Sequence, residues 1–89
     1  QIYYKDILYI TRDTIERMLI IYTLKNKFLV SSSIESIKSK LDSRFKTVHR
    51  ACIVNDDMVV EYNWSKKYFI LINGDKVFLL SKKYREDIK

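Results

Sequence analysis

Short apolar runs separated by polar breaks follow one another along the chain, a pattern typical of a mainly β domain. Ile7-Leu8-Tyr9-Ile10 is the first β-rich run, and the polar segment from Thr11 to Glu16 is expected to be an exposed loop. The runs at 17–23 and 28–30 flank a polar turn, so we expect them to pair as a hairpin.

One segment in the middle of the chain has the periodicity of a helix. Its apolar residues recur at spacings of three and four and are Ile34, Ile37 and Leu41. Ser32 or Ser33 stands where an N-cap is needed, and lysines follow towards the other end. The sequence therefore predicts a single central α-helix over about residues 33–42.

The second half of the chain returns to strand patterns. Residues 52–54 and 58–62 are expected to be strands, and the runs at 68–72 and 75–80 flank Asn73-Gly74. An Asn-Gly pair supplies the two positive-φ residues of a type I′ turn, which predicts a tight hairpin.

The chain finishes on a segment with a different pattern. Ser81 can act as an N-cap, and Tyr84 and Ile88 lie four residues apart on one face of a short C-terminal helical segment. With no linker or repeat, residues 1–89 are treated as one domain. We expect about seven to ten short strands in total.

Charge points to an anionic partner. The chain has 17 Lys and Arg against 11 Asp and Glu, a net charge of +6, which suits nucleic acid or an acidic lipid surface. Five of the basic residues fall within positions 38–50, opposed by one aspartate. This clustering predicts a surface that faces phosphates.

Several function classes are disfavoured by what the sequence lacks. The longest apolar run has four residues, too few to span a bilayer, and a single glycine cannot form a glycine-rich phosphate loop. Cys52 has no partner for a disulfide or a zinc site, and we expect it to be a buried apolar residue, with redox sensing as the alternative. His49 has no companion suited to catalysis, so neither an enzyme nor a cofactor is expected.

A specific motif follows the helix. It comprises Phe45, Val48, His49, Arg50, Ala51, Val54 and Asn55, and it is preceded by the run at 7–10 and followed by Ser81 with a basic pair. In this order the chain resembles the LytTR family of bacterial DNA-binding domains, the output modules of response regulators of the accessory-gene-regulator and VirR types. These regulators act in quorum sensing and virulence.

The resemblance implies an elongated domain of small β-sheets whose loops enter successive major grooves of duplex DNA. The loop that ends at Arg17, the segment 48–50 and the segment 81–83 correspond to the three base-reading loops of the family. The base contacts implied are Arg17, His49, Arg50 and Lys83. Relatives often have arginine where this chain has Thr47 and Lys83, and lysine cannot form the bidentate fork that arginine gives to guanine.

Affinity is expected to come from other side chains. We expect phosphate contacts from Lys38, Lys40, Arg44, Lys46, Lys66, Ser81 and Lys82. The resemblance also implies a target of paired direct repeats at a promoter, a bacterial cytoplasmic location and a receiver domain before residue 1. A homodimer on DNA and RNA polymerase are further candidate partners, and no membrane partner is expected.

Other interpretations stay open from the sequence. Arg17 could instead form an exposed ion pair with Glu16, and Asn55 more simply holds a turn. Among the aromatic residues we expect Tyr3, Tyr9, Phe28, Phe45 and Phe69 in the core, and Trp64 on the surface. A surface aromatic would suit a module that binds single-stranded nucleic acid or RNA. A module that docks on acidic proteins or anionic lipid is the remaining alternative.

Overall fold

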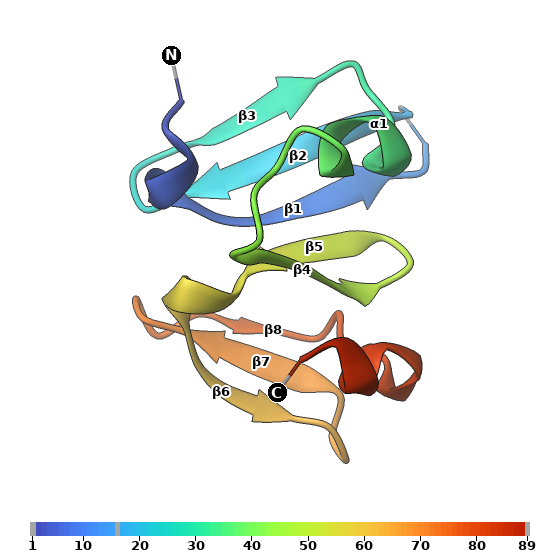
Figure 1. Ribbon diagram of the computed structural model, residues 1–89. Coiled ribbons are helices and arrows are strands. Elements are labelled where there is room, and N and C mark those ends of the chain that lie inside the picture. The colour runs from blue at the N-terminus through green and yellow to red at the C-terminus, as the bar shows by residue number, and fades with distance from the viewer. Residues whose placement is uncertain (1, 16, 89) are drawn as a thin grey trace.

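The computed structural model describes residues 2–15 and 17–88, which form two antiparallel sheets with one short α-helix (Figure 1). The five-stranded sheet has the order β3-β2-β1-β5-β4 and the three-stranded sheet the order β6-β7-β8. The strands of the two sheets are β1 (Ile7–Asp13), β2 (Met18–Thr23), β3 (Lys27–Val30), β4 (Phe45–His49), β5 (Cys52–Asn55), β6 (Val59–Asn63), β7 (Tyr68–Leu71) and β8 (Lys76–Val77). The α-helix is α1 (Ile34–Lys38), and three 3-10 turns are η1 (Tyr4–Asp6), η2 (Asp56–Met58) and η3 (Lys82–Asp87). The prediction of a mainly β fold with one central helix is confirmed.

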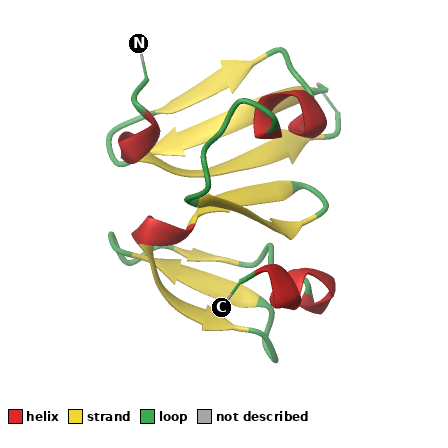
Figure 2. Ribbon diagram, in the orientation of Figure 1, coloured by secondary structure: helices red, strands yellow, loops and turns green. Residues whose placement is uncertain are grey.

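The inner strands β1 and β5 of the five-stranded sheet are buried, and α1 lies against the sheet (Figure 2). On one face Ile10, Leu19 and Ile53 pack with Ile34 of α1. On the other face β5 contributes Cys52 and Val54 to a second cluster, built with residues of the three-stranded sheet and its C-terminal extension. Successive side chains of a strand point to opposite faces, so β5 is buried on both sides, as its unbroken apolar run requires. The principal extents are 32 × 24 × 24 Å, a modest elongation.

Strand β1 is longer than the sequence pattern predicted. It continues to Asp13, so Thr11 to Asp13 are strand residues and the expectation of an exposed loop from Thr11 is wrong there. Thr11 pairs with Ile20 of β2 and Cys52 of β5 and is only 8 % exposed. Strands β2 and β5 supply hydrogen-bond partners for the backbone of this segment, and its polar side chains give no sign of this pairing.

The helix is shorter than predicted. Its N-cap is Ser33, whose side chain accepts a hydrogen bond from the Ser36 N–H at 3.0 Å. It ends at Lys38, and the N–H groups of Lys40 and Leu41 bond three residues back, which tightens the last turn. The segment after Lys38 therefore leaves the helix earlier than Asp42.

The Asn-Gly hairpin is present with a different turn. Only Gly74 of the pair has a positive φ, and the N–H groups of Gly74 and Leu71 bond to Leu71 and Asp75 at 2.8 and 2.9 Å. These bonds close a three-residue loop with glycine in the left-handed position, so the expectation of a type I′ turn is wrong. Strand β8 ends at Val77, and residues 78–80 leave the sheet instead of continuing it to Leu80.

Aromatic residues divide between core and surface differently from the prediction. Phe45 and Phe69 are buried as expected, and Tyr9 is partly buried, but Tyr3 is 57 % exposed and Phe28 38 % exposed. Trp64 is partly buried and stacks on Tyr62 with ring centroids 5.7 Å apart. One face of the Trp64 ring is therefore occupied within the protein, which does not favour it as a platform for an unpaired base.

Two predictions about buried polar and sulfur groups are supported. Asn55 is buried, and its amide donates to the carbonyl of Ile7 while its Oδ1 accepts from the Asp57 N–H, so it holds the turn after β5. Cys52 is fully buried, and this burial raises the pKa of its thiol, which disfavours the reactive thiolate. Within residues 2–15 and 17–88 no helix is long and apolar enough to cross a membrane.

Candidate nucleic-acid interface

Three loops that are far apart in the sequence lie along one side of the molecule (Figure 1). They are the β1–β2 loop, the β4–β5 turn and the start of η3. The N–H of Arg12 donates to the carbonyl of Ala51 at 3.0 Å, and the N–H of Ser81 donates to the carbonyl of Val48 at 2.8 Å. These two main-chain bonds connect each outer loop to the central turn. We call residues 12–17, 49–51 and 81–83 the loop edge.

The first loop carries Arg17 in an unusual backbone conformation. Its φ is 56°, in the left-handed region that residues other than glycine seldom adopt. The turn begins where Asp13 Oδ1 accepts a hydrogen bond from the Ile15 N–H at 3.0 Å, and the Ile15 side chain is 89 % exposed. The Arg17 side chain is exposed at the end of this loop. The alternative of an ion pair with Glu16 lies outside the described residues.

The central turn favours one tautomer of the His49 ring. Its Nδ1 accepts a hydrogen bond from the Ala51 N–H at 3.1 Å, so the neutral ring carries its proton on Nε2. Partial burial and then the positive charge of Arg50 lower the pKa of His49, and both favour this neutral form. The turn therefore presents an imidazole N–H donor beside the exposed guanidinium of Arg50.

The third loop is capped by its own serine. Ser81 Oγ accepts from the Lys83 N–H at 3.4 Å, which begins η3 and confirms Ser81 as N-cap. Lys82 and Lys83 are exposed, and the Lys83 ammonium lies 5.6 Å from the centre of the Tyr84 ring. A cation at this distance is attracted by the ring, which restricts where the lysine can reach.

The loop edge is rich in positive charge. Its residues include five basic and two acidic side chains in the sequence, a net charge of +3 (five minus two). The basic residues are Arg12, Arg17, Arg50, Lys82 and Lys83. Such an edge attracts a polyanion and offers donors for its oxygen atoms.

Not all predicted phosphate contacts lie at the loop edge. Arg44 bonds to Asp42 Oδ1 at 3.0 Å, and Arg44 and Lys46 line a shallow depression that also contains Asp56 and Asp57. Arg44 precedes β4 and Lys46 lies near its start, whereas Arg50 follows its end, and a strand advances about 3.3 Å per residue. The basic stretch 38–50 thus does not form one patch.

The remaining predicted lysines occupy other surfaces. Lys38 ends α1, and the carbonyl of Lys40 accepts a hydrogen bond from the Tyr4 hydroxyl at 2.8 Å. This bond ties Lys40 to η1, which lies on the side opposite the three loops (Figure 1). Lys66 is exposed in the turn between β6 and β7. That turn lies low on the same side as the three loops (Figure 1).

Arg12 is a basic residue of this edge that sequence reasoning missed. The segment that contains it was expected to be an exposed loop whose one base contact is Arg17, whereas Arg12 lies near the end of β1. The one signal in the sequence was the alternation of a strand, since Arg12 lies two residues after Ile10 and would share its face if the strand continued.

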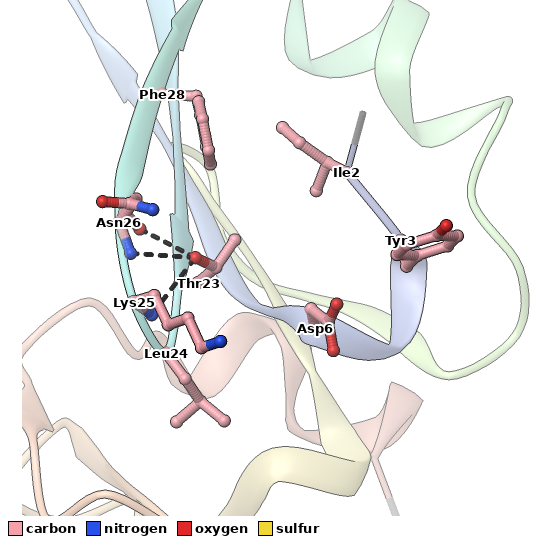
Figure 3. A pocket seen from close by; sticks show the side chains of 8 residues that line it. All are labelled: Ile2, Tyr3, Asp6, Thr23, Leu24, Lys25, Asn26 and Phe28. Atoms are coloured by element: carbon pink, nitrogen blue, oxygen red, sulfur yellow. Dashed lines mark hydrogen bonds between the residues drawn. The ribbon is translucent and has the colours of Figure 1, made fainter.

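The side away from the loops carries a separate cavity of 270 Å³ (Figure 3). It is lined by Ile2, Tyr3, Asp6, Thr23, Leu24, Lys25, Asn26 and Phe28. The Thr23 hydroxyl is engaged in the β2–β3 turn, where it accepts from the N–H groups of Lys25 and Asn26 at 3.4 and 3.1 Å. This cavity shares no residue with the loop edge. A substitution in its lining can therefore serve as a control for substitutions in the loop edge.

Fold and loop edge together define a β domain that offers charged loops, in place of a long helix, to an anionic partner. The LytTr DNA-binding domain family matches residues 1–89. The chain therefore belongs to the LytTR family of DNA-binding domains, which confirms the resemblance at the level of the family.

A solved structure agrees with this assignment. The LytTr DNA-binding domain of a protein described as a methyl-accepting/DNA response regulator from Bacillus cereus is similar, with a TM-score of 0.79 and 17 % sequence identity. The similarity covers 96 % of this chain and 79 % of the other chain, and at this identity it shows a shared fold. No curated protein matches the sequence.

Proposed function

We propose that this domain binds duplex DNA in a sequence-specific manner through the loop edge, with the three loops in successive major grooves. The observation that carries the proposal is the pair of main-chain bonds, Arg12 to Ala51 and Ser81 to Val48, which set the loops at fixed spacing on a basic edge. Fixed spacing matters because base edges repeat along the duplex with a regular geometry that a flexible loop cannot match without an entropic cost.

We assign one group of side chains to the bases and another to the phosphates of the DNA. Arg17, His49, Arg50 and Lys83 are the proposed base contacts. The best-supported phosphate contacts are Ser81, Lys82 and Lys66, because the start of η3 and the β6–β7 turn that carry them lie on the same side (Figure 1). Arg44 and Lys46, which share their surface with three carboxylates, are weaker candidates, and so are Lys38 and Lys40.

The regulatory setting is also a proposal. Family membership supports a role as the output domain of a two-component transcriptional regulator in the bacterial cytoplasm, joined to a receiver domain, on paired direct repeats. Two copies on adjacent repeats would then stand near RNA polymerase. Regulators of quorum sensing or virulence are one such setting.

The experiment selects the cognate duplex from a random library and then measures affinity by fluorescence anisotropy at several salt concentrations. Arg50→Ala is expected to cost about 1–3 kcal/mol on the selected site and to relax base preference at one position. Lys25→Ala, which removes a lysine from the β2–β3 turn on the other side, is the matched control and should bind like wild type.

Two outcomes would contradict the proposal. One is an Arg50→Ala domain that keeps wild-type affinity and the same base preference. The other is wild-type protein that prefers single-stranded oligonucleotides, acidic protein or anionic vesicles to every duplex in the library, which would favour the alternative classes of partner.

A further inference from the structure

A second cavity lies where the β1–β2 loop meets the segment that leads into α1. Its volume is 280 Å³, and it is lined by Arg12, Asp13, Thr14, Arg17, Ser32 and Ser33. One of these residues, Arg17, is a proposed base contact, while none of the others has been assigned a contact with DNA. The cavity therefore adjoins the loop edge and contains two guanidinium groups.

Arg12 has an unmet hydrogen-bonding group at this place. Its Nε is buried and has no hydrogen-bond partner within the described part of the chain, although its main-chain N–H is paired with Ala51. Guanidinium N–H groups that are removed from water without an acceptor are costly, and native proteins seldom keep them. Arg12 lines the cavity, so its Nε–H gains an acceptor when the side chain turns towards an anion bound there.

The lining favours an anion with several oxygen atoms. Ser33 Oγ already accepts from the Ser36 N–H, so its own O–H is available to donate, and Ser32 and Thr14 add further hydroxyl groups. Asp13 is the one carboxylate in the lining, and its Oδ1 accepts from the Ile15 N–H. Two arginines against one aspartate leave the cavity positive, and planar guanidinium groups match tetrahedral phosphate oxygens.

We propose that this cavity holds one backbone phosphate of the bound duplex, with Arg12 as its principal donor. The inference rests on the proposed function and adds to it a phosphate site between the first base-reading loop and the segment that leads into α1. The bond from Arg12 N–H to Ala51 fixes this phosphate relative to the turn that carries His49 and Arg50. Arg12 then contributes affinity and register, and no base preference.

The test compares Arg12→Gln and Arg12→Lys with Lys25→Gln as the charge-matched control on the remote side. Arg12→Gln is expected to weaken binding to the selected duplex about 10-fold or more and to reduce the salt slope by about 0.9. Arg12→Lys should restore the slope and only part of the affinity, because lysine keeps the charge and loses the fork. Base preference should be unchanged in both, and Lys25→Gln should match wild type.

A second measurement uses wild-type protein and so does not depend on the folding of a variant. Each phosphate of the duplex is replaced in turn by an uncharged methylphosphonate. One replacement should weaken wild type about as much as Arg12→Gln does, and the same replacement should cost Arg12→Gln nothing further. Inorganic phosphate alone should not shift the Arg12 Nε–H resonance at millimolar concentration.

The failures can be told apart. Wild type that binds no duplex overturns the proposed function itself. Wild type that binds with the expected Arg50 dependence, while Arg12→Gln keeps its affinity and salt slope, overturns only the phosphate site. Tight binding of free phosphate without DNA would reassign the cavity to a small anion.

Discussion

The main-chain N–H of Ser81 donates to the carbonyl of Val48 at 2.8 Å. Val48 lies in β4 of the five-stranded sheet, whereas Ser81 follows the last strand of the three-stranded sheet. Residues 78–80 leave the three-stranded sheet after Val77 so that Ser81 can reach β4. The bond places the start of η3 beside the turn that carries His49 and Arg50. Two of the three loops of the loop edge are thus joined by one backbone hydrogen bond.

Ser81→Pro should test this contact, because proline has no N–H and its φ near −65° differs from the −121° of Ser81. We expect the free energy of unfolding to fall by about 2–3 kcal/mol and DNA affinity to fall more than tenfold at a temperature where the variant is folded. Ser81→Ala keeps the N–H and loses only the cap, so about 0.5–1 kcal/mol is expected. Urea denaturation measures the free energy of unfolding, and fluorescence anisotropy measures DNA affinity. Equal losses of stability and affinity in Ser81→Pro and Ser81→Ala would contradict the role of the N–H.

Arg17 and Lys67 are the two described residues other than glycine with positive φ, at 56° and 63°. Glycine relieves this strain, so Arg17→Gly and Lys67→Gly should each leave stability unchanged or raise it by up to about 1 kcal/mol. Their effects on DNA should differ, with Arg17→Gly binding the selected site at least about tenfold more weakly and Lys67→Gly losing little. Thermal unfolding with anisotropy provides the comparison. A marked loss of stability in Arg17→Gly would mean that its side chain has a structural role.

His49 should make stability depend on pH near neutrality. Burial and Arg50 lower the pKa of His49 from its ordinary value of 6.5, so the folded state binds fewer protons than the unfolded state in this window. The free energy of unfolding should therefore fall as the pH drops below about 6.5 and level off once the pH is below the folded pKa.

The measurement is denaturant unfolding of wild type and His49→Gln at several pH values. Carboxylate titration contributes equally to both proteins, so it cancels in the difference between their free energies of unfolding. His49 is the one histidine of the chain, so its pKa can also be followed by NMR without overlap. A titration midpoint above 6.5, or a difference between the curves that does not change with pH, would contradict the burial and hydrogen bond described.

Asn55 should be costly to replace. It is 1 % exposed, donates to the Ile7 carbonyl at 2.9 Å and accepts from the Asp57 N–H at 3.1 Å, so it joins the start of β1 to the turn after β5. Asn55→Ala leaves both groups unpaired and is expected to lower the free energy of unfolding by about 2–3 kcal/mol. Tyr62→Phe removes one hydroxyl that donates to Asp56 and should cost less, about 1 kcal/mol. A nearly neutral Asn55→Ala would refute the structural role.

Much of the fold follows from local patterns in the sequence. The strand runs, the Ser33 cap, the burial of Cys52 and Phe45, and the role of Asn55 in a turn were predicted because each depends on a few neighbouring residues. The three loops were proposed as a site through the resemblance, whereas the main-chain bonds that hold them along one side of the molecule came from the structure.

Where β1 ends was decided by its partners, because β2 and β5 pair with Thr11 and draw a polar segment into the sheet. This pairing also brings Arg12 to the loop edge, where no sequence signal had placed it. The basic stretch 38–50 is continuous in the sequence, yet β4 carries Arg44 and Arg50 to opposite ends of a strand. By itself the sequence determined which segments form strands and a helix and that the domain is basic. The tertiary structure decided which charges share a surface, since that depends on strand length and pairing over long sequence separations.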